Sequence, residues 1–166
     1  MPIQKTTILL FALFFKMQSY AQLNTQLCKP TEEIIFAFQV KNQKWVSVCK
    51  EKNGKYLVYR FGKQNKIELQ YPAILDSNSW NQFTFKGYTR GGGKGNAAMH
   101  YAFLNFNKNG INYEVYETWD SEDDKEKCGV FVRVKNTFDM MGNLKSRKGN
   151  LLELLYDDKI NVEEEK

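Results

Sequence analysis

Residues 99–119 read MHYAFLNFNKNGINYEVYETW, and this stretch decides the fold of the chain. Two runs rich in aromatic and β-branched residues flank Asn109-Gly110, and both residues of this dipeptide tolerate a positive φ angle. The pattern therefore predicts a β-hairpin. Centring the turn on Asn-Gly predicts three cross-strand pairs: Phe106 with Tyr113, Leu104 with Val115, and His100 with Trp119. The opposite face carries Tyr101, Phe103 and Tyr116, so both faces are rich in aromatic residues.

Similar β-rich runs and turn signals continue outward from this hairpin in both directions. A second Asn-Gly, Asn53-Gly54, predicts another hairpin, with Cys49 opposite Val58. We expect strands over residues 34–40, 45–49, 56–61, 67–71, 82–86, 99–106, 111–119 and 129–134. Only residues 151–156, with Asn150 as N-cap, are expected to be helical. The sequence therefore predicts a mainly β fold, an antiparallel sandwich or barrel of about eight strands with a short C-terminal helix.

The N-terminus has the pattern of a secretory signal peptide. Lys5 precedes an apolar run over 6–15, and Ser19 and Ala21 hold the two small-residue positions before a cleavage site. The run is too short to span a membrane. We therefore expect a signal peptide over 1–21 and a single β domain over 22–166, exported to the periplasm or the cell exterior. No transmembrane segment is expected in the mature chain.

The charge of the mature chain is modest. Removal of residues 1–21 takes Lys5 and Lys16 and no acidic residue, which lowers the formal net charge from +5 to +3. Basic residues are interspersed with acidic ones, apart from a basic run at 145–148 that we expect to be a solvated loop. Nucleic-acid binding requires basic residues clustered on one face, so no nucleic-acid partner is expected.

The mature chain contains three cysteines, Cys28, Cys49 and Cys128. In an oxidising compartment two of them are expected to form a disulfide. We favour Cys28 with Cys49, because Cys28 lies just before a predicted hairpin whose second strand carries Cys49. Cys49 with Cys128 is the alternative. The remaining cysteine is expected to be a buried free thiol, with an intermolecular link as the less favoured outcome.

Residues suited to catalysis or metal binding are few. His100 is the only histidine, and packing against Trp119 is favoured over a role as a catalytic base. A zinc site made from the three cysteines and His100 lacks the close ligand pairs typical of such sites. The acidic segment 120–126 lacks the glycine and glutamate positions of an EF-hand loop. No catalytic residue, metal site or cofactor is therefore predicted.

The most distinctive segment is a glycine-rich loop with basic residues, Arg90-Gly91-Gly92-Gly93-Lys94-Gly95-Asn96. It does not match a P-loop, which requires Gly-Lys-Ser/Thr at the start of a helix, and it does not match a dinucleotide fingerprint, because strands flank it on both sides. One interpretation is a flexible or tightly turned connection. The other is a loop whose backbone N–H groups contact an anion or a partner. The candidate binding surface comprises Arg60, Tyr88, Arg90, Gly91, Gly92, Gly93 and Lys94.

Four short motifs carry a resemblance that spans residues 45–134. They are Val46-Ser47-Val48-Cys49, Tyr59-Arg60-Phe61-Gly62, Glu68-Leu69-Gln70-Tyr71-Pro72 and Tyr88-Thr89-Arg90-Gly91-Gly92-Gly93. In this order they resemble a group of small exported bacterial β-proteins of unknown function. The resemblance implies an exported β domain, and it brings no catalytic residues to carry over.

The sequence favours a non-enzymatic binding module that recognises a protein or a cell-envelope glycan. Two alternatives remain open. The first is an exported hydrolase that uses carboxylates, with Glu68, Glu114 or Glu117 as candidates, because all three lie on predicted strands. The second is a structural envelope protein, which is expected to have no cleft and a flat, self-complementary sheet edge.

Overall fold

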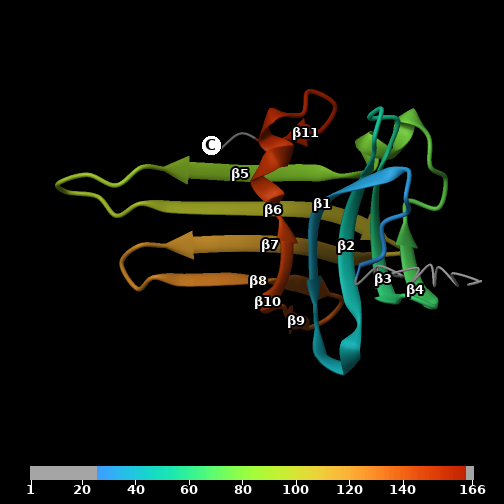
Figure 1. Ribbon diagram of the computed structural model, residues 1–166, viewed down its shortest axis with the longest axis horizontal. Coiled ribbons are helices and arrows are strands. Elements are labelled where there is room, and N and C mark those ends of the chain that lie inside the picture. The colour runs from blue at the N-terminus through green and yellow to red at the C-terminus, as the bar shows by residue number, and fades with distance from the viewer. Residues whose placement is uncertain (1–25, 164–166) are drawn as a thin grey trace, which may run out of the picture.

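The computed structural model describes residues 26–163, so the expected signal peptide over 1–21 lies outside the described residues. The described chain forms two sheets and only short 3-10 helices. One sheet has the strand order β10-β1-β2-β3-β4 and the other β11-β5-β6-β7-β8-β9 (Figure 1). All pairings are antiparallel except that of β11 with β5.

The strand bounds are β1 (Glu32–Gln39), β2 (Trp45–Glu51), β3 (Leu57–Lys63), β4 (Lys66–Tyr71), β5 (Thr84–Arg90), β6 (Met99–Lys108), β7 (Ile111–Asp120), β8 (Lys125–Arg133), β9 (Thr137–Met141), β10 (Asn143–Gly149) and β11 (Asn161–Val162). The 3-10 helices are η1 (Lys41–Gln43), η2 (Ser77–Gln82) and η3 (Leu151–Tyr156).

Both Asn-Gly hairpins form as predicted. Asn109 and Gly110 have φ angles of 54° and 79°, in the left-handed region that this dipeptide accepts. The three predicted pairs between β6 and β7 are all present, and Cys49 lies opposite Val58. The register that the Asn-Gly turn predicts for the two longest strands, β6 and β7, is therefore confirmed.

The two sheets share one hydrophobic core between them. Its fully buried members include Phe36, Val48 and Tyr59 from the five-stranded sheet and Phe85, Leu104 and Val115 from the six-stranded sheet. Neither sheet closes on itself, so the barrel alternative is wrong.

The C-terminal part of the chain differs most from the prediction. The expected helix at 151–156 is the 3-10 helix η3, in which the Asn150 side chain accepts a hydrogen bond from the Leu152 N–H as the predicted N-cap. The basic run at 145–148 is not a solvated loop but part of β10, which pairs with β1. Strands β9, β10 and β11 were not predicted. They explain why the described residues contain more strands than expected.

The N-terminal segment covers the side of the five-stranded sheet that faces away from the core. The disulfide joins Cys28 of this segment to Cys49 of β2, as favoured from the sequence. Beside it, the Leu27 N–H donates to the Ser47 hydroxyl. Cys128 is a buried free thiol, and burial raises its pKa to about 12.

The six-stranded sheet extends well beyond the five-stranded sheet. In Figure 1, strands β5 to β8 continue past β1 and β10 and end in two loops with no sheet above them. The burial pattern agrees, because Leu104 and Val115 are fully buried whereas His100 and Trp119, on the same face, are partly exposed. We call this region the projecting half; it comprises residues 86–90, 99–103, 116–120 and 125–129 with the loops between them.

Candidate functional site

Three aromatic side chains lie side by side on the outer face of the projecting half, which is the face turned away from the core. Tyr88 of β5 is in direct register with Tyr101 of β6, and their ring centroids are 5.4 Å apart at an interplanar angle of 25°. Phe103 lies next to Tyr101, with ring centroids 5.6 Å apart. All three side chains are partly exposed. We call these three side chains the aromatic platform.

The alternation of each strand produces this surface. Side chains two residues apart in a strand point to the same face, so Lys86 and Arg90 accompany Tyr88 on the outer face. The inner face carries the residues between them. There Gly87 leaves room for the Phe85 ring, which lies 2.7 Å from the position of an added Cβ. Leu152 of η3 is also close to Gly87, so η3 packs on the inner face and leaves the platform open.

Charged and polar groups frame the platform. The Lys86 ammonium group lies 5.8 Å from the centre of the Tyr101 ring. Across the sheet, Tyr101 pairs with Thr118 and Thr118 with Lys127, so a lysine also ends this row on β8. A shallow hollow of about 310 Å³ lies here, lined by residues that include Met99, Tyr101, Phe103, Thr118 and Lys127.

A second aromatic pair continues the outer face toward the covered part of the sheet. The rings of Tyr116 and Phe131 are stacked with centroids 4.5 Å apart. The Tyr116 hydroxyl donates to Asp139 of β9 at 2.9 Å, and burial raises the pKa of this tyrosine. Gly129 is required beside it, because an added Cβ would lie 2.5 Å from the Tyr116 hydroxyl oxygen.

The inner face of the projecting half carries a different set of groups. His100 stacks on Trp119 as predicted, with ring centroids 5.8 Å apart. The Trp119 indole N–H donates to Asp124 at 3.2 Å, and these residues with Glu126 line an open hollow of about 580 Å³. Burial lowers the pKa of His100, and its Nε2 atom is shielded from solvent without a hydrogen-bond partner in the described part of the chain.

Glu117 marks the boundary between the covered and projecting parts of the inner face. Its side chain is 1% exposed and accepts a hydrogen bond from the Leu151 N–H at 2.7 Å. Arg147 of β10 forms ion pairs with both Glu117 and Glu126. Burial raises the pKa of Glu117, although the Leu151 N–H and Arg147 oppose that effect. These contacts join β10 and η3 to the six-stranded sheet.

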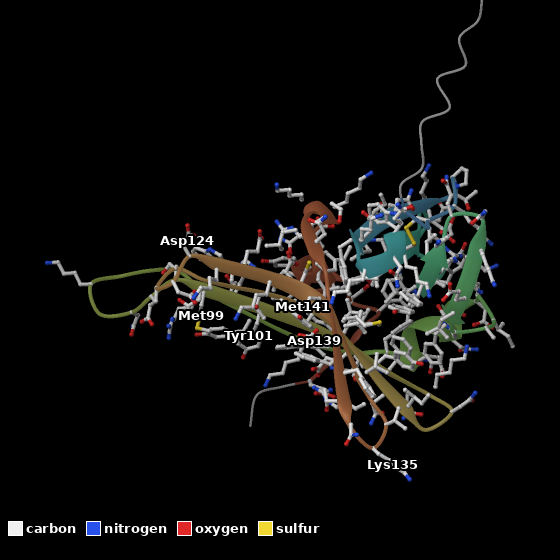
Figure 2. All side chains as sticks on the ribbon, turned by 90° about the horizontal axis from the view of Figure 1, so that it is seen from below. Met99, Tyr101, Asp124, Lys135, Asp139 and Met141 are labelled. Atoms are coloured by element: carbon white, nitrogen blue, oxygen red, sulfur yellow. A yellow bond between two sulfur atoms is a disulfide. The ribbon has the colours of Figure 1, made fainter. Side chains whose placement is uncertain are left out.

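The predicted binding residues are only partly brought together. Tyr88 and Arg90 share the outer face of β5, and the Arg90 Nε–H donates to the Ala97 carbonyl at 3.1 Å. Lys94 is exposed in the loop at the tip of the projecting half. Figure 2 shows Met99 and Tyr101 near this end of the strands, and Lys135 beyond their opposite end.

Arg60 does not belong to this surface. Its side chain is 0% exposed and forms a bidentate ion pair with Glu32, with nitrogen–oxygen distances of 2.6 and 2.8 Å. It also donates to the Leu27 carbonyl, beneath the N-terminal segment on the far side of the five-stranded sheet. Burial raises the pKa of Glu32, but hydrogen bonds from Arg60 and the Lys29 N–H outweigh this and lower it overall. The prediction of Arg60 as a surface binding residue is therefore corrected.

The glycines of the loop are not required by its backbone conformation. Gly91, Gly92 and Gly93 have no φ angle in the left-handed region, and an added Cβ at Gly91 or Gly93 meets no atom within 4 Å. The connection is nevertheless tightly turned, because Gly93 and Asn96 form an antiparallel β-bridge around the turn at residues 94–95. The Gly93 N–H donates to the Asn96 carbonyl at 3.0 Å, so this N–H is already engaged within the loop.

The three carboxylates considered for hydrolysis lie in separate places. Glu114 and Glu117 are on opposite faces of β7, because they are three positions apart in the strand. Glu114 forms an ion pair with Arg133 at 2.7 Å. Glu68 is in the other sheet and forms an ion pair with Lys44 at 2.7 Å. This separation counts against a paired-carboxylate mechanism.

One group of three possible metal ligands occurs among residues 26–163. The sulfur atoms of Cys28 and Cys49 and a Glu32 oxygen lie within 4.8 Å of one another. The two sulfur atoms are joined in the disulfide, and Glu32 is engaged by Arg60. This group therefore offers no thiolate ligand in the oxidised protein.

Sequence reasoning identified Arg90 on the outer face but missed the two lysines there and the second aromatic pair. Lys86, Lys127 and Phe131 belong to the site because of the register across four strands. The register of β6 with β7 was predicted, and extending the same alternation to β5 and β8 identifies these residues. Asp139 gave no signal, because β9 itself was not predicted.

Comparisons with known proteins add no relative. No protein-family model, curated protein or solved structure matches this chain. The resemblance to small exported β-proteins therefore stays a prediction. In the described part of the chain, every helix is too short or too polar to cross a bilayer.

Proposed function

We propose that this protein is an exported, non-enzymatic binding protein that recognises a cell-envelope glycan through the aromatic platform. The observation that carries the proposal is the row of partly exposed rings of Tyr88, Tyr101 and Phe103 on a sheet face that η3 and β10 leave open. Contiguous apolar surface that a fold leaves partly open to solvent is a feature of binding sites in soluble proteins. The rings pack on one another, so little side-chain entropy is lost when a ligand binds.

A glycan fits this surface better than a protein partner does. A sugar ring has an apolar C–H face that packs on an aromatic ring and a rim of hydroxyl groups that requires polar partners. The platform offers both, because Thr118 and Lys127 continue the row that Tyr88 and Tyr101 begin. The centre of a protein–protein interface is depleted of charged residues. Lysine in particular is depleted there, and here the Lys86 ammonium group lies directly beside the Tyr101 ring.

Export is part of the proposal. It is supported by the signal-peptide pattern of residues 1–21 and by the Cys28–Cys49 disulfide, since disulfides persist in oxidising compartments. The separate positions of Glu68, Glu114 and Glu117 favour binding over hydrolysis. Lysines along the open segments of β5 and β8 disfavour edge-to-edge assembly of a structural component.

The test is affinity electrophoresis of the purified, oxidised protein in gels that contain soluble cell-envelope polysaccharides. We expect at least one polysaccharide to retard the protein, and Tyr101→Ala to weaken this binding about tenfold through loss of ring stacking. The matched control is Tyr156→Ala, which removes a tyrosine that is 83% exposed in η3, away from the platform. Retardation that is unchanged in Tyr101→Ala, or absent for every polysaccharide, contradicts the proposal.

A further inference from the structure

The outer face of the projecting half has a charge that its inner face does not share. The strand segments of the projecting half carry four cationic side chains, and all four point to the outer face: Lys86, Arg90, Lys125 and Lys127. Asp120 is the one carboxylate on the outer face of these segments. Asp123, in the adjoining loop, forms an ion pair with Lys125 at 2.8 Å. On the inner face the strands carry Glu117 and Glu126 instead. Cations are therefore concentrated on the side that carries the platform.

We infer that the platform binds an acidic glycan, one whose sugar rings carry carboxylates. This inference rests on the proposed function and names its ligand class. A sugar packed on Tyr101 would place its substituents beside Lys86, whose ammonium group lies 5.8 Å from the centre of that ring. Lys127 lies at the β8 end of the cross-strand row formed by Tyr88, Tyr101 and Thr118, and its side chain is exposed. Cationic groups thus lie on two sides of the ring that is central to the platform.

The strand geometry repeats this arrangement along β5. Lys86, Tyr88 and Arg90 alternate on one face, about 6.6 Å apart at the usual rise per residue. A chain of sugars running along this strand would meet a cation, a ring and a second cation in turn. The Arg90 Nε–H is bonded to the Ala97 carbonyl, which fixes the side chain beside the platform. Arg90 is therefore held in place before a ligand arrives.

Exposed charge pairs contribute little individually, so the affinity must come from several of them together. One such pair changes an equilibrium about threefold, and two or more are expected to change it about tenfold. Their effect is screened by salt, because the cations are close to solvent. A rival explanation for the lysines is protection of the open edges of β5 and β8 against association. The experiment must separate these two roles.

The probes are oligomers of galacturonic acid and their methyl esters, which share ring and linkage and differ in charge. Binding of each to the oxidised protein is measured by isothermal titration calorimetry at about 0.05 M and about 0.5 M salt. We expect the acid to bind about tenfold more tightly than the ester at low salt, and the difference to disappear at high salt. Lys86→Gln/Lys127→Gln should lower the affinity for the acid towards that of the ester, with Arg90 accounting for the difference that remains.

The matched control is Lys52→Gln/Lys135→Gln, which removes the same charge at two exposed positions outside the projecting half, just beyond β2 and β8. Figure 2 shows Lys135 far from Tyr101. Equal loss in both double variants would mean attraction to the net charge alone and would overturn the inference. Equal affinity for acid and ester would overturn it and leave the proposed function standing. No binding of either probe would also overturn it, and the polysaccharide gels then decide the proposed function. Self-association of Lys86→Gln/Lys127→Gln with unchanged affinity would assign the lysines to edge protection.

Discussion

Strands β5 to β8 run through two regions: the two-sheet body, where the five-stranded sheet covers their inner face, and the projecting half, where it does not. Within β6, Leu104 is fully buried against the five-stranded sheet, whereas His100 on the same face is partly exposed. The side chains of β6 alternate between the two faces in the same way at both residues. What changes is that the five-stranded sheet covers Leu104 and does not cover His100. An alternating aromatic pattern therefore builds a core where a second sheet lies over it and an accessible surface where none does.

The boundary between the two regions is set by charge. Glu117 is the last inner-face residue of β7 that is buried, and it binds Arg147 and the Leu151 N–H. A buried carboxylate needs such partners, because transferring an unpaired charge out of water is costly. The apolar core therefore ends where β10 and η3 supply a cation and a backbone donor.

The largest difference in stability is expected between variants of Arg60 and Arg90, two arginines that we predicted from the sequence to share one surface. Arg60→Ala should lower the free energy of unfolding by about 4 kcal/mol, because Glu32 would stay buried without its partner. Arg90→Ala should change it by less than about 1 kcal/mol, since Arg90 is partly exposed. Urea unfolding followed by circular dichroism measures both values. Arg90→Ala should weaken glycan binding. The Arg60→Ala molecules that remain folded should bind the glycan as tightly as the native protein does.

The double variant Glu32→Gln/Arg60→Ala tests the cause of the first effect. It removes both charges, so it should be more stable than Arg60→Ala alone. A double variant as unstable as the single one would show that packing, and not the unpaired charge, explains the loss. Similar losses for Arg60→Ala and Arg90→Ala would abolish the distinction between the body and the projecting half.

Removal of the disulfide is expected to have the next largest effect. Cys28 and Cys49 are 21 residues apart, so Cys28→Ser/Cys49→Ser should lower the free energy of unfolding by about 3 kcal/mol. The bond lies on the far side of the five-stranded sheet, so the affinity of the folded variant for a glycan should stay unchanged. Adding a reductant should destabilise the native protein and leave this variant unaffected. Weaker binding by the folded variant would show that the two regions are coupled.

Most of the local structure was predictable from the sequence. Asn109-Gly110 and Asn53-Gly54 set two registers correctly, because a turn that needs positive φ leaves few alternatives. The Cys28–Cys49 pairing followed from the hairpin it adjoins. Strand β10 was missed because residues 143–149 are polar and charged. It is a strand because its backbone pairs with β1 and because Arg147 reaches Glu117.

The candidate site was predictable only in part, for a physical reason. Tyr88, Tyr101 and Arg90 follow from alternation within each strand. Whether a face is covered depends on how the two sheets are placed, and no local pattern reports that. Arg60 shows the same limit. An arginine on a strand reads as exposed unless its partner is known, and Glu32 lies in a strand that is not adjacent to β3.

The smallest effect is expected at the boundary, where Glu117→Gln tests the charge that ends the core. Burial raises the pKa of Glu117 above its ordinary value of 4.5, so folding favours the protonated form. The stabilisation from this group is thus complete below about pH 4.5 and is lost as the pH rises through the raised pKa. Glutamine keeps the acceptor for the Leu151 N–H and does not ionise. The stability of Glu117→Gln relative to the native protein should therefore increase with pH.

Thermal unfolding of both proteins between about pH 4 and pH 8 measures this difference. Arg147 and Glu126 also face Glu117, so the variant Glu126→Gln is needed to separate the charge of Glu126 from that of Glu117. Cys128 lies opposite Glu117 and stays protonated over this range, because its pKa is raised to about 12. Glu114→Gln, on the outer face of the same strand, is the matched control for the loss of one carboxylate. If the native protein instead gains stability over Glu117→Gln as the pH rises, the ion pair with Arg147 outweighs burial. The Glu117–Arg147 ion pair at the boundary of the core would then stabilise the fold, and ionised Glu117 would not be a net cost.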